Sequence, residues 1–138
     1  MSIRFNEEDV RDMGRNAMGV KAITLKEDDE VVAMDLVEEG KYLLVVSEFG
    51  FGKRTSLDEY RIQNRGGVGL KTYNIKKKTG KLISAKVIDE NDEIIMISMA
   101  GVIIRLKIKD ISKMGRNTQG VTLMKINNEN DKVMAVAK

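Results

Sequence analysis

Short apolar segments, separated by turns that contain glycine or acidic residues, run through the whole chain. The first four lie at about 19–25, 31–37, 42–48 and 51–56, and four more at about 69–75, 82–88, 93–98 and 102–107. Val, Ile and Leu dominate these segments, and their lengths are those of strands. There is no Pro and no long stretch with helical periodicity. The pattern predicts an all-β protein.

The apolar pattern differs between strands. Val45-Val46 and residues 94–97 are continuously apolar, which predicts strands buried on both faces. The segment 102–109 alternates apolar and basic residues near its end, which predicts a half-exposed strand.

The same landmarks recur about every 50 residues. One set of arginines, each four residues before a glycine, has spacings of 50 and 51 residues: Arg15, Arg65 and Arg116. A second set has the same spacings: Arg4, Arg54 and Arg105. A unit of this length with four strands has the size of a propeller blade. We expect a fragment of a single domain with propeller-like blades of four antiparallel strands. Residues 1–14 would end one blade, 15–64 and 65–115 would form repeat units, and 116–138 would begin another.

The residue types exclude most catalytic and metal chemistry. Cysteine and histidine are absent, which removes disulfides, Ser-His-Asp and Cys-His triads, and the usual zinc ligand sets. The glycine run lacks a nucleotide-binding motif, and the acidic turns lack an ordered calcium-ligand spacing. We therefore expect no catalytic residue, no metal and no cofactor. No apolar run approaches a membrane span, and residues 1–8 do not have the apolar region of a signal peptide, so we expect a cytoplasmic protein without a membrane partner.

Charge is unevenly placed along the chain. Residues 1–64 carry nine Lys/Arg against fourteen Asp/Glu, whereas residues 65–138 carry fifteen against seven. Such asymmetry indicates a polyanion partner for one surface, the alternative being a solvated charged surface. Because repetition places equivalent residues at equivalent points of a ring, the two arginine sets are expected to form a belt of six guanidinium groups. The alternative is that one set bonds internally.

Candidate phosphate contacts lie in the fourth strand of each unit, at its exit and in the glycine run that follows. Arg and Lys bind phosphate oxygens, and glycine lets a backbone approach a phosphate closely. For the glycines, an ordinary β connection is the alternative. The candidates are Arg4, Lys53, Arg54, Arg61, Arg65, Gly66, Gly67, Gly69, Lys71, Arg105, Lys107 and Arg116.

One segment carries a family resemblance. Glu59-Tyr-Arg-Ile-Gln-Asn-Arg-Gly-Gly-Val-Gly69 resembles the pattern Glu-Tyr-Arg-x-Gln-x-Arg-Gly-Gly-Lys-Gly of the C-terminal domain of the DNA gyrase A subunit. Residues 9–25, 52–55 and 101–105 resemble repeats of that domain, and the similarity covers about 3–137. The order of these motifs along the chain resembles that in the last part of the C-terminal domain. Asn64 and Val68 stand where the family box has basic residues, and that box usually sits in a first blade. The resemblance thus extends DNA contact to Arg65 and the glycines, but not the full wrapping role.

The resemblance implies a six-bladed β-pinwheel with strands exchanged between blades. Its rim would bind and bend double-stranded DNA through the phosphate backbone, with weak sequence specificity. The whole protein would be an ATP-dependent type II topoisomerase that introduces negative supercoils, with its catalytic residues outside this chain. Its partners would be the gyrase B subunit, together with the rest of the gyrase A subunit. Two alternatives stay open: the C-terminal domain of the topoisomerase IV A subunit, or a propeller-like protein-interaction module.

Overall fold

A computed structural model describes residues 1–138, apart from the side chain of Glu39. Its regular structure consists of β-strands and 3-10 turns, and no α-helix occurs in the part of the chain that it describes. The strands are β1 (Tyr42–Ser47), β2 (Phe51–Ser56), β3 (Leu82–Ile88), β4 (Glu93–Ser98), β5 (Ile103–Lys107), β6 (Val121–Thr122) and β7 (Val133–Ala137). The 3-10 turns are Glu7–Asp9, Val37–Glu39, Leu57–Glu59 and Ile108–Asp110. The all-β prediction is confirmed.

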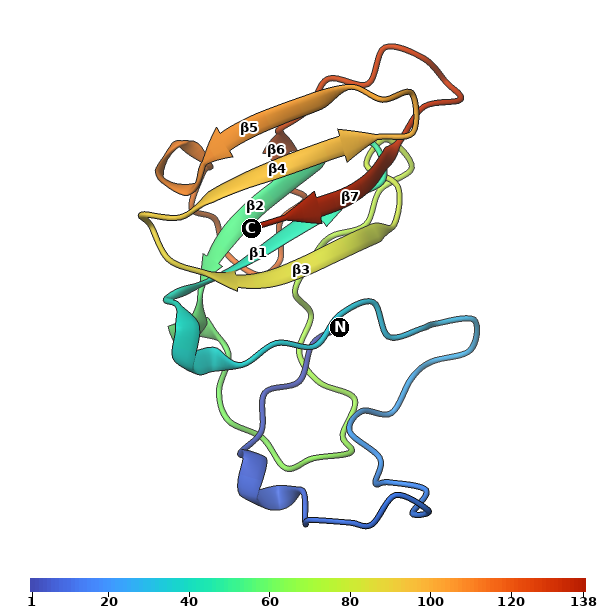
Figure 1. Cartoon of the computed structure of the whole chain (residues 1–138), viewed down its shortest axis with the longest axis vertical. Helices are drawn as coiled ribbons and strands as arrows, with labels where there is room; N and C mark the ends of the chain where they lie inside the picture. Colours follow the sequence, from blue (N-terminus) through green and yellow to red (C-terminus); the bar gives the residue numbers. More distant parts are fainter.

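Two antiparallel sheets are each built on a hairpin from one repeat and completed by strands from later repeats (Figure 1). The first sheet has the order β3-β1-β2-β6. Its hairpin, β1 and β2, is flanked by β3 from the next repeat and by β6 from the repeat after that. The second sheet has the order β5-β4-β7, and β7 again comes from the following repeat. Strands are therefore exchanged between neighbouring repeats.

The strand register repeats with the same interval as the sequence. Leu44 of β1 pairs with Arg54 of β2, and Ile95 of β4 pairs with Arg105 of β5. A register shift follows Val46 in the β1–β3 pair and Ile97 in the β4–β7 pair, 51 residues apart. The spacing of the motifs therefore reflects a spacing of structure.

The hydrophobic core lies between the two sheets. It joins Leu44 and Val46 of β1 to Ile94 and Met96 of β4, together with Ile88, Ile108, Ile111, Met124 and Val133. Leu44, Val45 and Val46 are all buried, so β1 is covered on both faces as predicted. The same prediction is wrong for β4, where Ile95 is 42% exposed because its face of the sheet points to solvent.

Three expected strands, 19–25, 31–37 and 69–75, are irregular in the structure, except that Val37 begins a 3-10 turn. A strand forms only where a neighbour completes its hydrogen-bond ladder. Residues 31–37 stand at the same position of the repeat as β3 and β7. In those later repeats, β3 pairs with β1 and β7 pairs with β4. Val31 and Met34 are instead 63% and 91% exposed. Residue 70 makes a single bridge, to Ser2.

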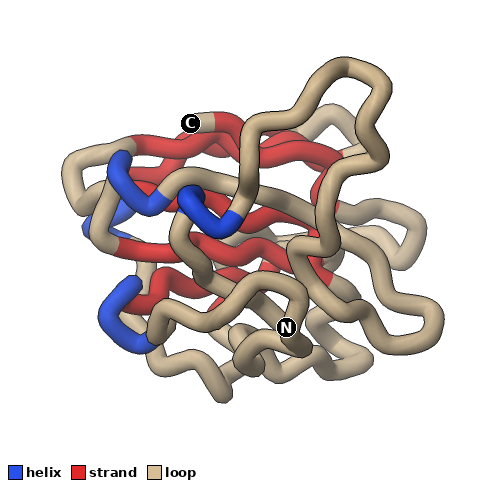
Figure 2. The backbone as a smooth tube through the Cα atoms, turned by 90° about the horizontal axis from the view of Figure 1, so that it is seen from below, coloured by secondary structure: helices blue, strands red, loops and turns tan.

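The two ends of the sheets differ. Figure 2 shows the 3-10 turns on one side of the strands. Two of them, Leu57–Glu59 and Ile108–Asp110, directly follow the second strand of a hairpin. The hairpin turns lie at the other end, where Glu48 N donates to Lys81 O and Met99 N to Lys132 O, both at 2.9 Å. The repeat thus gives the molecule one end rich in 3-10 turns and one end of hairpin turns.

Candidate nucleic-acid interface

Of the set Arg4, Arg54 and Arg105, the first two arginines tie one repeat to the next. Arg4 Nη1 donates to Leu57 O at 3.1 Å and to Tyr60 O at 3.3 Å. Arg54 Nε donates to Ile111 O at 2.8 Å, and Ile111 stands 51 residues after Tyr60. Arg54 is 8% exposed and its guanidinium lies 4.6 Å from the centre of the Tyr42 ring. Only the third member, Arg105, is exposed among the three, and it pairs with Glu93.

Lys53 is completely buried. Its Nζ donates to Gly115 O at 2.6 Å, to Arg116 O at 2.8 Å and to Thr118 Oγ1 at 3.0 Å. An ammonium group has three donors, and all three are used here. Burial lowers the pKa of Lys53 from 10.5 to about 8, with a smaller opposing effect of the Glu59 carboxylate. Lys53 therefore positions the segment around Arg116 and cannot reach a phosphate.

The expected belt of six outward guanidinium groups is thus not what the structure contains. Arg54 is buried and Arg4 is half-buried with its Nη1 bonded inside the protein. Lys53 and Arg54 leave the set of candidate DNA contacts for this reason. One signal in the sequence was available for Lys53: it stands at the repeat position of Ile3 and Ile104, where an apolar side chain is otherwise used.

Of the set Arg15, Arg65 and Arg116, the last two arginines form two equivalent basic corners. In the first corner, Arg65 Nη1 donates to Lys21 O at 2.6 Å and Arg65 Nε to Asp9 O at 3.1 Å. In the second corner, Arg116 Nη1 donates to Lys71 O at 3.1 Å. Each guanidinium is half-buried, and the lysine beside it is exposed. Each corner therefore places an arginine and a lysine together at the surface.

The basic corners lie near the 3-10 turns. Asp9, which accepts from Arg65, ends one such turn, and Glu59, whose Oε1 accepts from Arg116 N at 3.4 Å, ends another. Lys21 was missed by the sequence reasoning. Its signal was its position, one residue after Gly19-Val20, as Lys71 follows Gly69-Leu70.

The glycines shape the corners. Gly66 N donates to Ala22 O at 2.8 Å, and Gly66 O accepts from Thr24 Oγ1 at 2.6 Å. Gly67 O accepts from Thr24 N at 2.8 Å. Gly69 has φ +80°, and a Cβ there would collide with Ser2 O. The glycine run therefore serves close backbone packing, and the Gly66 N–H is not free for a phosphate.

The remaining candidates are exposed. Arg61 follows the Leu57–Glu59 turn. Lys107 ends β5, where it shares a lining with the carboxylates of Glu90, Asp92 and Glu93, so the structure does not favour it as a phosphate contact. Among the residues that the structure describes, no group of acidic side chains is arranged to hold a metal ion. Within the same residues, there is no helix with the length and apolarity of a membrane span.

Strand exchange, a 51-residue structural interval and a basic corner at matching points of successive repeats define a propeller-type repeat protein. The chain also matches the sequence model of a protein family. The chain belongs to the family described as "DNA gyrase C-terminal domain, beta-propeller", which matches residues 1–38, 41–89 and 92–138. The fold class expected from the sequence, and the resemblance behind it, are confirmed.

Known proteins of this kind are similar over nearly the whole chain. The DNA gyrase A subunit of Ureaplasma parvum serovar 3 is 46% identical over 137 residues, which is 99% of this chain and 16% of the relative. That of Streptomyces coelicolor is 40% identical over 139 residues, with the same two shares. The chain therefore spans about a sixth of the length of these relatives.

Two solved structures share the fold. The structure of a DNA gyrase A C-terminal domain has a TM-score of 0.88 and 34% identity, and the match covers 96% of this chain and 45% of that one. The C-terminal domain of a DNA topoisomerase IV has a TM-score of 0.87 and 26% identity, with 96% of this chain and 42% of that one covered.

Proposed function

We propose that the chain is a DNA-binding part of a DNA gyrase A subunit, which holds duplex DNA by its phosphates and helps to wrap it. The observation that carries the proposal is the pair of basic corners, Lys21 with Arg65 and Lys71 with Arg116, at equivalent points of successive repeats. Family membership supports the same partner. Contacts repeated along a surface can offset the energy of bending a duplex, which is a few kcal/mol over 20–30 base pairs.

Catalysis would belong to the rest of the protein. The whole enzyme would be an ATP-dependent type II topoisomerase that introduces negative supercoils, acting in the cytoplasm with the gyrase B subunit. This chain would set the path of the DNA and add to the affinity of the whole enzyme for DNA. Sequence specificity would be weak, because the corners offer charge to phosphates and no element positioned to read base edges.

The experiment is charge reversal at the two exposed corner lysines. The double variant K21E/K71E leaves the internal arginine bonds in place. Its affinity for a short duplex should fall, and the slope of log affinity against log salt should decrease in magnitude by about two, one for each phosphate that is no longer bound. The measurement is fluorescence anisotropy of a labelled duplex at several salt concentrations.

The matched control is K81E/K132E, which makes the same charge change at two exposed lysines 51 residues apart. These lysines lie at the hairpin-turn end of the sheets, away from the basic corners. Equal losses in the two double variants would show that net charge alone governs binding, and would refute the basic corners as the interface.

A second candidate is the topoisomerase IV A subunit, favoured by the solved structure with a TM-score of 0.87. The identity of that match is lower, 26% against 34% for the gyrase domain. The gyrase and topoisomerase IV candidates differ in the partner subunit that each requires. The protein that contains this chain should supercoil relaxed DNA together with a gyrase B subunit, but not together with the topoisomerase IV subunit that corresponds to gyrase B.

A further inference from the structure

Equivalent clefts open at the 3-10-turn end of the two sheets. The first, of about 450 Å³, lies where β1 begins and β2 ends, and its lining includes Arg4, Lys41, Tyr42, Asp58 and Lys113. The second, of about 210 Å³, is lined by Glu90, Asn91, Asp92, Glu93, Lys107 and Lys109. Asp92 and Glu93 stand 51 residues after Lys41 and Tyr42.

The same backbone contact closes both clefts. Leu57 N donates to Lys41 O at 3.0 Å in the first, and Ile108 N donates to Asp92 O at 2.9 Å in the second. The linings, however, differ in charge. The first cleft has three cationic side chains and one carboxylate, and the second has three carboxylates and two lysines. The repeat therefore presents one architecture with two different linings, cationic side chains in the first cleft and carboxylates, each paired with a cation, in the second.

The cations of the first cleft retain capacity for a ligand. Arg4 uses Nη1 for its internal bonds, and Lys113 Nζ lies 5.8 Å from the centre of the Tyr42 ring. Among the side chains that the structure describes, no ion pair engages Arg4, Lys41 or Lys113. A lining with one guanidinium and two ammonium groups suits a phosphate, whose oxygens accept several charge-assisted hydrogen bonds.

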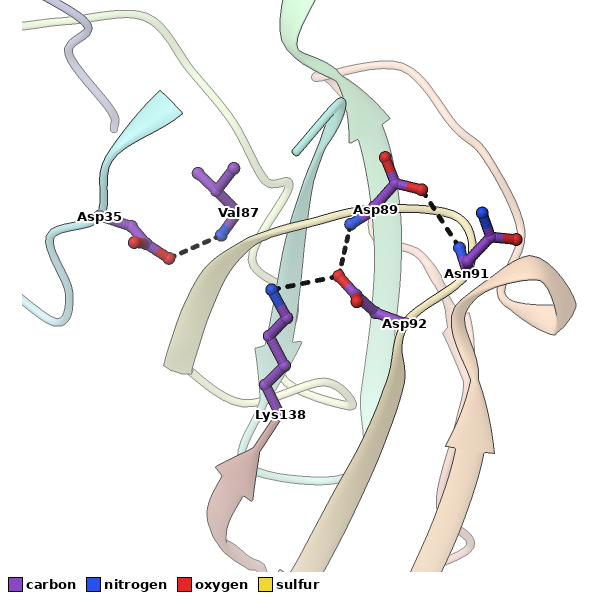
Figure 3. A network of polar contacts seen from close by, with 6 residues as sticks. All are labelled: Asp35, Val87, Asp89, Asn91, Asp92 and Lys138. Carbon is purple, nitrogen blue, oxygen red and sulfur yellow. Dashed lines mark hydrogen bonds and ion pairs between the residues drawn. The ribbon is translucent and has the colours of Figure 1, made fainter. Parts of the chain in front are cut away.

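The acidic side chains of the second cleft already have partners. Figure 3 shows the Asp92 carboxylate between Lys138 Nζ, at 3.2 Å, and the backbone N–H of Asp89, at 2.7 Å. Glu93 Oε2 accepts from Arg105 Nε at 2.7 Å. A phosphate in the second cleft would lie beside three carboxylates, and repulsion between these negative charges disfavours its binding there.

The first cleft is close to the second basic corner. Lys113 and Arg116 are three residues apart, and three extended residues span at most about 10 Å. The segment between them is held from inside by Lys53, which donates to Gly115 O and Arg116 O. Lys41, Lys113, Arg116 and Lys71 can therefore belong to one basic strip along the 3-10-turn end.

We propose that the first cleft is a phosphate-binding site, occupied by a phosphodiester group of the duplex that the second basic corner also holds. This inference rests on the proposed function for the source of the phosphate. Its distinctive consequence is asymmetry: DNA contacts the first sheet at its cleft and avoids the equivalent cleft of the second.

The experiment compares two double variants of the whole chain, K41A/K113A and K107A/K109A. Each removes two lysines, from the first and from the second cleft respectively, and Arg4 is left alone because it holds Leu57 and Tyr60. Duplex affinity is measured by anisotropy over a range of salt, with circular dichroism to show that both variants are folded. K41A/K113A should lose about tenfold or more in affinity near 0.1 M salt, with a slope smaller by about two. K107A/K109A should stay within about threefold of the unaltered chain.

Three results would overturn parts of this account, and they are distinguishable. No duplex binding by the unaltered chain would refute the proposed function. Binding with equal losses in the two variants would refute the phosphate site in the cleft. Release of the duplex by inorganic phosphate far beyond that by chloride of equal ionic strength would assign the cleft to a free phosphate compound, and would refute the phosphodiester as its occupant.

Discussion

The ammonium group of Lys53 lies 2.6 Å from the carbonyl oxygen of Gly115, 62 residues further along the chain. This contact joins β2 of the first hairpin to the turn that carries Arg116. A buried cation therefore supports a surface cation, and the stability of the fold is coupled to the geometry of the candidate DNA contact.

Lys53→Met should destabilise the chain. The change removes the Lys53 donor from two carbonyl oxygens and a hydroxyl. Gly115 O still accepts from Thr118 Oγ1, but Arg116 O loses the bond from Lys53, and a buried acceptor left unsatisfied costs about 1–3 kcal/mol. The free energy of unfolding is measured by urea denaturation. Lys107→Met, at an exposed lysine of β5, is the control and should change it by less than about 0.5 kcal/mol. Equal effects would contradict the role given to Lys53.

The burial of Lys53 also predicts a pH dependence. Because the pKa of Lys53 is about 8 in the folded chain and near 10.5 when unfolded, the unfolded chain binds more protons between these values. Stability contributed by Lys53 should therefore rise with pH above about 8 and be lost as pH falls through 8. Burial raises the pKa of Tyr60 and Tyr73, whose contributions are lost as pH rises above 10. The difference between the unaltered chain and Lys53→Met isolates Lys53, and a difference that does not grow from pH 7.5 to 9.5 would contradict this assignment.

Gly120 and Gly19 offer a matched test of the strand exchange. Both have a positive φ, +77° and +82°, in which an L side chain is strained. A Cβ at Gly120 would collide with Gly52 O, whereas one at Gly19 meets nothing within 4 Å. Gly19→Ala should cost about 1–2 kcal/mol, and Gly120→Ala about 1–3 kcal/mol more. Thermal or urea unfolding measures both, and similar losses would show that β6 does not pack against β2 as described.

Arg54 and Arg105 occupy the same repeat position but should respond differently to substitution. Arg54→Met removes the bond to Ile111 O and leaves a buried acceptor, which should cost about 1–3 kcal/mol. Arg105→Met removes an exposed pair with Glu93, which is worth at most about 1 kcal/mol. Unfolding measurements on the two variants check this order. The reverse order would mean that the arginine ties between repeats do not hold the fold.

The sequence predicted the hairpins and the repeat, because β1, β2, β4 and β5 carry their own apolar pattern and turns. It overpredicted strands at 19–25 and 31–37, since a strand also requires a neighbour that the local pattern does not reveal. It placed Lys53 and Arg54 at the surface because charged side chains are usually exposed. Their burial depends on carbonyl groups about 60 residues away, which only the folded chain brings into range. Arg65, a candidate from the sequence, lies half-buried at the first basic corner, and the lysine beside it follows from a contact between repeats.

The central claim is that the chain holds duplex DNA through phosphates, and the salt dependence of its affinity tests this most directly. The cations of the two basic corners and the first cleft, seven in all, would give a slope of log affinity against log salt of about −6. Affinity should then fall by roughly several thousandfold between 50 and 200 mM salt. An affinity that is unchanged over this range would contradict the account and would favour docking of an apolar partner.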